Sequence, residues 1–206
     1  SSRRPECPDC LRARRDCICR WRRELTPAPA VLILQHPLEI RQAKGSGRLL
    51  HLSLQGSVLA YGEQFDEAAL GRLLYGAAGD KAVQPVLLYP CGPGDPPAIA
   101  GVPAPDSLRL VILDATWRKS RKMLHLNPLL QQLPRLPLID SPASRYGIRK
   151  AHRPDQLSTL EAACHALMQL EGVHGKYLPL QEAFDGFVAQ QRSYIAQDAP
   201  LSNPPV

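Results

Sequence analysis

The sequence predicts an α/β protein with a mainly parallel sheet flanked by helices. Short, predominantly apolar runs at 31–34, 86–89 and 108–113 are typical of strands that are buried on both faces. Segments with helical spacing of apolar residues lie between these runs, and this alternation favours a parallel sheet. The 206 residues are 44% hydrophobic and 21% charged, which is enough chain and apolar surface for one core without disulfides.

The first half of the chain contains the first strand and two helices. Residues 31–34 are a purely apolar strand, and 44–48 are a basic, glycine-rich loop. This loop leads into a helix at 49–52, and 57–61 is predicted as a short strand. Residues 65–74 have the apolar spacing of an amphipathic helix.

The middle of the chain carries the strands that end in polar loops. The strand at 86–89 is followed by a turn rich in proline and glycine, and the strand at 108–113 leads into an acidic residue. A basic helix is predicted at 117–126, where it stops before a proline. Residues 136–139 are predicted as the fourth apolar strand.

Two helices follow near the C-terminus. Ser158 and Glu161 form a capping-box pattern, so a helix should start there and end at Gly172. The last helix is predicted over 179–196 because proline suits a first helical turn. Residues 199–206 are expected to be frayed. No stretch approaches the ~20 apolar residues of a membrane span, and no signal peptide is visible, so we expect a cytoplasmic protein without a membrane partner.

Four of the six cysteines lie within thirteen residues, in the pattern C-x2-C-x6-C-x-C: Cys7, Cys10, Cys17 and Cys19. Two close pairs of thiolates suit the four-coordinate shell of a structural zinc. Disulfides or free thiols are the alternatives, and a reducing cytoplasm disfavours disulfides. We therefore predict an arginine-rich zinc-binding knuckle over 1–25, followed by the α/β domain over 26–198.

Basic residues are clustered, and the formal net charge is +6. Residues 1–24 hold eight arginines and four acidic residues, and two further basic runs lie near 118–122 and 145–153. Solvated faces would explain one cluster, but three favour a nucleic-acid partner. The candidate RNA-binding residues are Arg14, Arg15, Arg48, Arg118, Arg121, Arg145 and Lys150.

The carboxyl edge of the sheet is the expected site, because parallel sheets bind ligands there. The loops at 89–94, 114–117 and 140–150 should meet at this edge. Asp114 ends an apolar strand, where it can accept a proton or instead cap a helix. Thr116 offers a hydroxyl or a cap, and Trp117 is either a core residue or a surface for stacking a base.

Other familiar motifs are absent from the sequence. There is no Walker loop, no G-x-G-x-x-G fingerprint and no G-x-S-x-G nucleophile elbow. Phosphate transfer, nicotinamide redox chemistry and serine hydrolysis therefore have no support. His36, between a strand and a proline, is predicted to be a hydrogen-bonded structural residue.

Several motifs in order carry a family resemblance: the four cysteines, Gln35-His36-Pro37-x-Glu39, Gly47-Arg48-Leu49-Leu50, Leu88-Tyr89-Pro90, Asp114-Ala115-Thr116-Trp117, Ser144-Arg145-Tyr146-x-Ile148-Arg149-Lys150 and Leu157-Ser158-Thr159-Leu160-Glu161-Ala162. Together they resemble the DTW-domain family, the tRNA-uridine aminocarboxypropyltransferases. The match covers about residues 7–170. Ala115 replaces the usual glycine and Ser46 a common threonine, and neither change removes a reactive group.

The resemblance implies a fold similar to the knotted SPOUT-like methyltransferases, with S-adenosylmethionine held at the carboxyl edge of the sheet. The implied reaction moves the 3-amino-3-carboxypropyl group to N3 of a tRNA uridine and releases methylthioadenosine. Asp114 is the candidate base, with Thr116 and Trp117 beside it. The implied co-substrate-binding residues are Leu88, Tyr89, Pro90, Asp114, Ser144, Tyr146, Arg149, Ser158 and Thr159.

Two alternatives stay open at this point. An S-adenosylmethionine-dependent RNA methyltransferase of the same fold would need the same co-substrate, base and RNA. A non-catalytic zinc-knuckle RNA-binding module would need no acid–threonine–tryptophan loop at a strand end. The oligomeric state is also open, since no clean apolar helix stripe demands a partner.

Overall fold

An all-parallel sheet forms the centre of the part of the chain that the structure describes, in the strand order β2-β1-β4-β3-β5. The structure is a computed structural model and describes residues 5–42, 44–77, 82–99, 103–139, 157–173 and 175–197. The strands are β1 (Ala30–Gln35), β2 (Val58–Tyr61), β3 (Gln84–Leu88), β4 (Leu108–Asp114) and β5 (Arg135–Leu136). The prediction of an α/β fold with a parallel sheet is confirmed.

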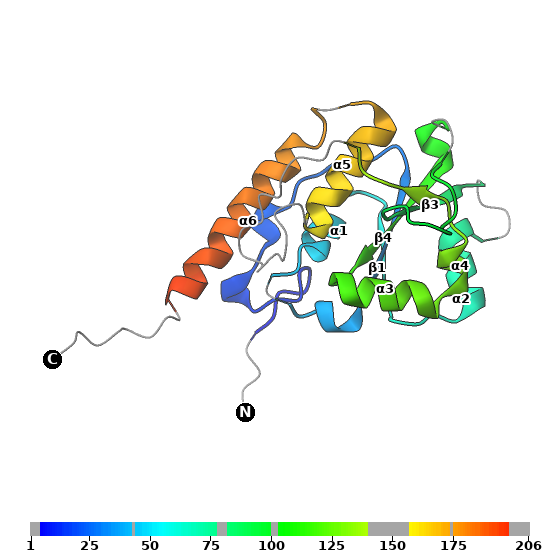
Figure 1. Cartoon of the computed structure of the whole chain (residues 1–206). Coiled ribbons are helices and arrows are strands. Elements are labelled where there is room, and N and C mark those ends of the chain that lie inside the picture. Colours follow the sequence, from blue (N-terminus) through cyan, green and yellow to red (C-terminus); the bar gives the residue numbers. More distant parts are fainter. Residues whose placement is uncertain are drawn as a thin grey trace.

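Helices cover both faces of this sheet (Figure 1). The α-helices are α1 (Gly47–Ser53), α2 (Glu67–Tyr75), α3 (Trp117–Leu126), α4 (Pro128–Gln131), α5 (Thr159–Glu171) and α6 (Leu178–Gln197). Short 3-10 turns are η1 (Arg14–Asp16), η2 (Cys19–Trp21), η3 (Pro37–Glu39) and η4 (Pro105–Ser107). No helix in these segments has the length and apolarity to cross a bilayer. The knot implied by the resemblance stays a prediction.

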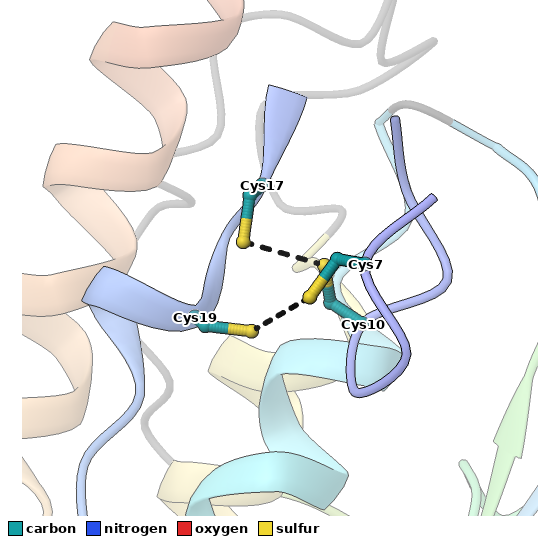
Figure 2. Close-up of side chains that lie close together, drawn as sticks. All are labelled: Cys7, Cys10, Cys17 and Cys19. Atoms are coloured by element: carbon teal, nitrogen blue, oxygen red, sulfur yellow. Dashed lines mark hydrogen bonds between the residues drawn. The ribbon is translucent and has the colours of Figure 1, made fainter. Parts of the chain in front are cut away.

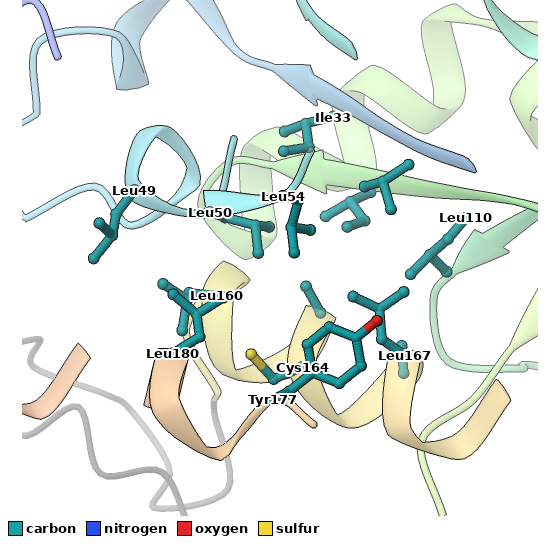
Figure 3. Packing of buried hydrophobic residues seen from close by; sticks show 14 of the residues in the cluster. Ile33, Leu49, Leu50, Leu54, Leu110, Leu160, Cys164, Leu167, Tyr177 and Leu180 are labelled. Carbon is teal, nitrogen blue, oxygen red and sulfur yellow. The ribbon is translucent and has the colours of Figure 1, made fainter. Parts of the chain in front are cut away.

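The central strands β1, β3 and β4 are mostly apolar because they contribute to the cores on both faces of the sheet. In β1, Val31 and Ile33 join the cluster under α1, α5 and α6, whereas Leu32 and Leu34 join the cluster under α2, α3 and α4. Side chains of a strand point alternately to the two faces of the sheet, so both faces must be apolar where both are covered. Figure 3 shows the first cluster, in which Ile33 of β1 faces α5 and α6 across the leucines of α1.

The predicted cap of α5 is confirmed. The Ser158 hydroxyl accepts from the Glu161 N–H at 3.2 Å, and the Glu161 carboxylate accepts from the Ser158 N–H at 2.8 Å. The helix ends at Gly172, whose φ of 66° is in the left-handed region that glycine tolerates. Local sequence therefore sets both ends of this helix.

The predicted strand at 136–139 was wrong in its bounds. The strand β5 contains only Arg135 and Leu136, and it pairs with β3. Pro137 has no N–H to donate, so the ladder stops at this edge. The short helix α4 was not predicted, because Pro128 read as the end of the preceding helix although it starts a new one.

The N-terminal segment packs directly onto the α/β core. Cys10 and Ile18 are buried in the same apolar cluster as Leu180 and Phe187 of α6. The Trp21 indole N–H donates to the Gln190 side chain at 2.5 Å. The domain boundaries at 25 and 198 stay predictions, and 198–206 lie outside the described residues.

Candidate active site and metal centre

The four N-terminal cysteines converge on one point, and Figure 2 shows their sulfur atoms directed toward one another. All four sulfurs lie within 4.8 Å of one another. The Cys7 and Cys19 sulfurs are 3.6 Å apart, and the Cys10 and Cys17 sulfurs are 3.8 Å apart. A tetrahedral zinc with ~2.3 Å bonds places its sulfurs ~3.8 Å apart, whereas a disulfide needs ~2.05 Å. The geometry therefore fits a zinc ion and does not fit a disulfide.

Local backbone structure prepares this cluster for a cation. The Leu11 N–H donates to the Cys7 carbonyl at 2.9 Å, and Leu11 has a φ of 58°, which closes the tight turn. Backbone N–H groups of Cys10 and Asp9 lower the pKa of Cys7 to about 7. Burial and the neighbouring sulfurs raise the pKa of Cys19. Thiols this close cannot all ionise alone, and a bound metal ion would allow all of them to do so.

Asp114 lies at the centre of the carboxyl edge of the sheet. It ends β4 in register with Gln35 of β1, and it is 2% exposed. The Gln35 amide donates to Asp114 Oδ2 at 2.6 Å, and the Thr159 hydroxyl donates to Oδ1 at 2.6 Å. The carboxylate therefore joins two strands to the first turn of α5.

The first turn of α1 abuts this carboxylate. A Cβ placed on Gly47 would lie 2.2 Å from Asp114 Oδ2, so no other side chain fits without movement. The neighbouring Ser46 is buried, and its hydroxyl accepts from the Leu160 N–H at 3.2 Å. The starts of α1 and α5 are thus locked together beside Asp114. Sequence reasoning assigned no role to Gln35 or Gly47, although both lie in the motifs that carried the resemblance.

An aromatic pair joins the residue after β3 to the first residue of α3. The rings of Tyr89 and Trp117 stack with their centroids 5.1 Å apart and their planes 12° apart. The Arg135 guanidinium lies 5.7 Å from the Tyr89 ring, and this buried arginine had no predicted role. Trp117 is 53% exposed, so it is not a core residue. The Tyr89 hydroxyl oxygen is buried without a hydrogen-bond partner among the described residues, and burial raises the pKa of Tyr89.

The remaining predicted site residues fall into two groups. Leu88 is half-buried at the end of β3, whereas Pro90 and Thr116 are exposed. Thr116 is the N-cap residue of α3, but its side chain makes no cap hydrogen bond. The others lie in 140–156, outside the described residues: Ser144, Arg145, Tyr146, Arg149 and Lys150.

Helix α3 divides its basic residues between two roles. Lys119 pairs with the buried Glu39 at 2.8 Å, and Lys122 pairs with Glu63 at 2.8 Å. Arg118 and Arg121 are exposed on the same helix. The two lysines therefore attach α3 to the neighbouring loops, and the two arginines are available to a polyanion.

His36 is buried and hydrogen-bonded, as predicted for a structural residue. Its Nδ1 accepts from the Leu38 N–H at 3.1 Å, and its Nε2 lies 3.0 Å from the Glu63 carboxylate. Hydrogen bonds from Lys122 and then His36 lower the pKa of Glu63. This network connects the end of β1 to α3.

Two other predicted RNA-binding residues lie in the N-terminal segment. Arg14 and Arg15 are exposed on η1. Arg48 differs from them, because its guanidinium donates to the Asp9 carbonyl and to the Tyr61 hydroxyl. Of these three residues, Arg14 and Arg15 therefore have the exposure expected of residues that contact a phosphate.

The architecture is that of a parallel α/β protein with buried polar residues at the carboxyl edge of its sheet, a stacked aromatic pair and a cluster of four N-terminal thiols that could hold a metal ion. A profile of the DTW domain matches residues 4–192, and the chain belongs to this family.

Curated relatives agree with this membership. The chain is 31% identical over 182 residues to tRNA-uridine aminocarboxypropyltransferase 2 of Drosophila melanogaster, covering 82% of this chain and 68% of the fly protein. It is 29% identical over 177 residues to the protein of that name from Mus musculus, covering 83% of this chain and 58% of the mouse protein. These names agree with the sequence-based prediction of a transferase. No solved structure matches the chain.

Proposed function

We propose that this protein is a tRNA-uridine aminocarboxypropyltransferase that uses S-adenosylmethionine. The observation that carries the proposal is the family match over 4–192, combined with the meeting of its motif residues at one edge of the sheet. Relatives named for this activity support it. A cytoplasmic location belongs to the same proposal.

The carboxyl edge has features that suit S-adenosylmethionine. The exposed face of Trp117 can stack on a flat heterocycle, and the buried Tyr89 hydroxyl lacks a partner in the described part of the chain. We assign co-substrate binding to Leu88, Tyr89 and Pro90 on one side and to Ser158 and Thr159 on the other. Ser144, Tyr146 and Arg149 complete the proposed set. When bound, the co-substrate supplies a carbon made electrophilic by the sulfonium.

The proposed transfer is a nucleophilic substitution at that carbon. Uracil N3 gives up its proton and forms the new N–C bond, while the C–S bond breaks and its electron pair goes to sulfur. The leaving group is neutral methylthioadenosine. This chain must therefore remove one proton and hold N3 in line with the breaking bond.

We assign proton removal to Asp114. Its two hydrogen-bond donors, Gln35 and Thr159, hold the carboxylate in one orientation at the edge of the sheet. Each carboxylate oxygen has two lone pairs and can accept more than one hydrogen bond. Trp117 and Thr116 lie next to it on the α3 side, where the uracil ring would enter.

We further propose that exposed arginines hold the tRNA backbone and that the cysteine knuckle holds a structural zinc. Arg14, Arg15, Arg118 and Arg121 are exposed and would each neutralise a phosphate. Arg145 and Lys150 belong to the same proposed set. Cys7, Cys10, Cys17 and Cys19 would ligate the zinc with no open position, so its role is structural.

The decisive experiment is mass analysis of tRNA and of the released nucleoside after incubation with S-adenosylmethionine. We expect uridine to gain an aminocarboxypropyl group and methylthioadenosine to accumulate. A methyl gain with S-adenosylhomocysteine would establish the methyltransferase alternative instead. Unmodified tRNA together with tight tRNA binding and no co-substrate binding would identify a non-catalytic RNA-binding module.

A further inference from the structure

Arg48 connects the cysteine knuckle to the carboxyl edge of the sheet. Its Nε and Nη2 both donate to the Asp9 carbonyl, at 3.1 and 2.7 Å. Its Nη1 donates to the Tyr61 hydroxyl, at 2.6 Å, at the carboxyl end of β2. Asp9 stands between the metal-ligand candidates Cys7 and Cys10. One guanidinium therefore spans from the metal loop to the outer strand of the sheet.

Arg12 makes a second connection from the same loop. Its Nη2 donates to the Gly45 carbonyl at 2.9 Å and lies 3.4 Å from the Gln42 carbonyl. The guanidinium also lies 5.2 Å from the Phe187 ring of α6. Gly45 directly precedes the Ser46–Gly47 start of α1. Arg12 therefore holds the segment that leads into the site.

Both arginines are attached to the segment that contacts Asp114: Arg12 through the Gly45 carbonyl, and Arg48 as part of α1. Arg48 is the second residue of α1, and Gly47 before it touches the Asp114 carboxylate. Ser46 holds the first turn of α5 through the Leu160 N–H. A knuckle that loses its fold would release both arginines and, with them, the start of α1.

We propose that Arg12 and Arg48 are positioning residues that couple zinc binding in the knuckle to co-substrate binding at the carboxyl edge. The proposal rests on the proposed function, because it takes S-adenosylmethionine as the ligand of that edge. It assigns Arg48 a role inside the protein in place of a phosphate contact. Three of its five N–H donors are used by protein acceptors, whereas a residue awaiting phosphate would present its fork to solvent.

The coupling has a reciprocal form that equilibrium measurements can detect. If zinc strengthens co-substrate binding by some factor, bound co-substrate must strengthen zinc binding by the same factor. A hydrogen bond to a charged group contributes enough for an effect of roughly tenfold or more. We therefore expect roughly tenfold coupling in the natural protein and its loss when either arginine is replaced.

The test measures two equilibria on zinc-loaded, full-length protein. Titration calorimetry gives the S-adenosylmethionine affinity, and competition with a chromogenic chelator gives the zinc affinity with and without S-adenosylmethionine. The variants are Arg48→Met, Arg48→Lys and Arg12→Met. Arg22→Met is the matched control, because Arg22 is an exposed knuckle arginine that pairs with Glu24. We expect weaker binding of both ligands in the three variants and no change in the control.

Lysine at position 48 separates the two roles of that residue. It keeps the charge that a phosphate contact needs but cannot bridge Asp9 and Tyr61 as the fork does. The proposal is supported if Arg48→Lys behaves like Arg48→Met and the salt dependence of tRNA binding is unchanged. It is overturned if lysine restores natural behaviour, or if Arg48→Met lowers the salt slope and leaves both affinities unchanged.

The proposed function can fail separately. Natural protein that binds no S-adenosylmethionine would refute the proposed co-substrate. The zinc affinities from the chelator competition then show by themselves whether the two arginines stabilise the knuckle. Urea unfolding of each variant identifies one that is merely unfolded, and Arg12→Met then tests the same connection independently. Equal zinc affinity in Arg12→Met, Arg48→Met and the control would overturn the proposal.

Discussion

Asp114→Asn provides the sharpest test of how the carboxyl edge works. The Asp114 carboxylate accepts hydrogen bonds from Gln35 and Thr159, each at 2.6 Å, and is 2% exposed. Asparagine has nearly the same shape: its oxygen can still accept from Gln35, but its NH₂ then faces Thr159, whose hydroxyl must turn from donor to acceptor. A hydrogen bond to a charged group contributes about 1.5–3 kcal/mol. Exchanging two hydrogen bonds to a charged group for two weaker neutral ones should therefore lower the free energy of unfolding by about 1–3 kcal/mol.

The variant should still fold, because single domains have about 5–15 kcal/mol of stability. If Asp114 is the base, the transfer rate should fall by at least ~100-fold, since general-base help is worth ~10²–10⁴. Part of the loss should be recovered as pH rises toward the pKa of uracil N3. The assay is single-turnover transfer of labelled aminocarboxypropyl group to tRNA across a pH series, with urea unfolding in parallel.

Thr159→Val is the matched control for this experiment. It removes one donor to the carboxylate with little change in shape and leaves the carboxylate itself in place. We expect a loss of about 1.5–3 kcal/mol of stability and no recovery of rate with pH. A near natural rate in Asp114→Asn would refute the base assignment. An equal, pH-independent loss of transfer rate in both variants would show that Asp114 positions the neighbouring side chains without accepting the proton.

Three further predictions concern charge, packing and pH. Reversing the charges of Arg118 and Arg121 should make the plot of log tRNA affinity against log salt concentration less steep by about 0.7–0.9 per lost phosphate contact, with co-substrate affinity unchanged. An unchanged slope would mean that these residues form a solvated face. Gly186→Ala should lower the stability measured by urea unfolding by about 1–3 kcal/mol, because its Cβ would lie 2.2 Å from an indole carbon of Trp21. Gly71→Ala is the matched control: its Cβ would have no atom within 4 Å, so it should raise the stability by up to about 1 kcal/mol. Burial alone would raise the pKa of Glu171, but hydrogen bonds from neighbouring donors lower it overall. Its stabilising effect is therefore present above the ordinary carboxyl pKa and is lost as pH falls through the lower pKa of the folded state. In urea unfolding, the stabilities of natural protein and Glu171→Gln should become equal at acid pH, and a difference that persists there would contradict this.

Features encoded by short sequence patterns could be predicted without the structure. The continuous apolar runs predicted β1, β3 and β4 because a strand covered on both faces has no polar side. The capping box predicted the start of α5 because its hydrogen bonds join residues three apart. The spacing of the cysteines predicted their convergence for the same reason, since a short loop constrains where four nearby thiols can point.

Only the tertiary structure brought together residues that are distant in sequence. Asp114 was a candidate from its position at a strand end, but its partners Gln35 and Thr159 come from another strand and from a helix. Arg48 read as one more basic residue in a basic loop, yet its fork binds Asp9 and Tyr61. Charge and residue type are properties of the sequence, but the packing of the sheet, the helices and the knuckle determines which groups come within hydrogen-bond distance. That packing depends on contacts across the whole chain, which is why no local pattern revealed it.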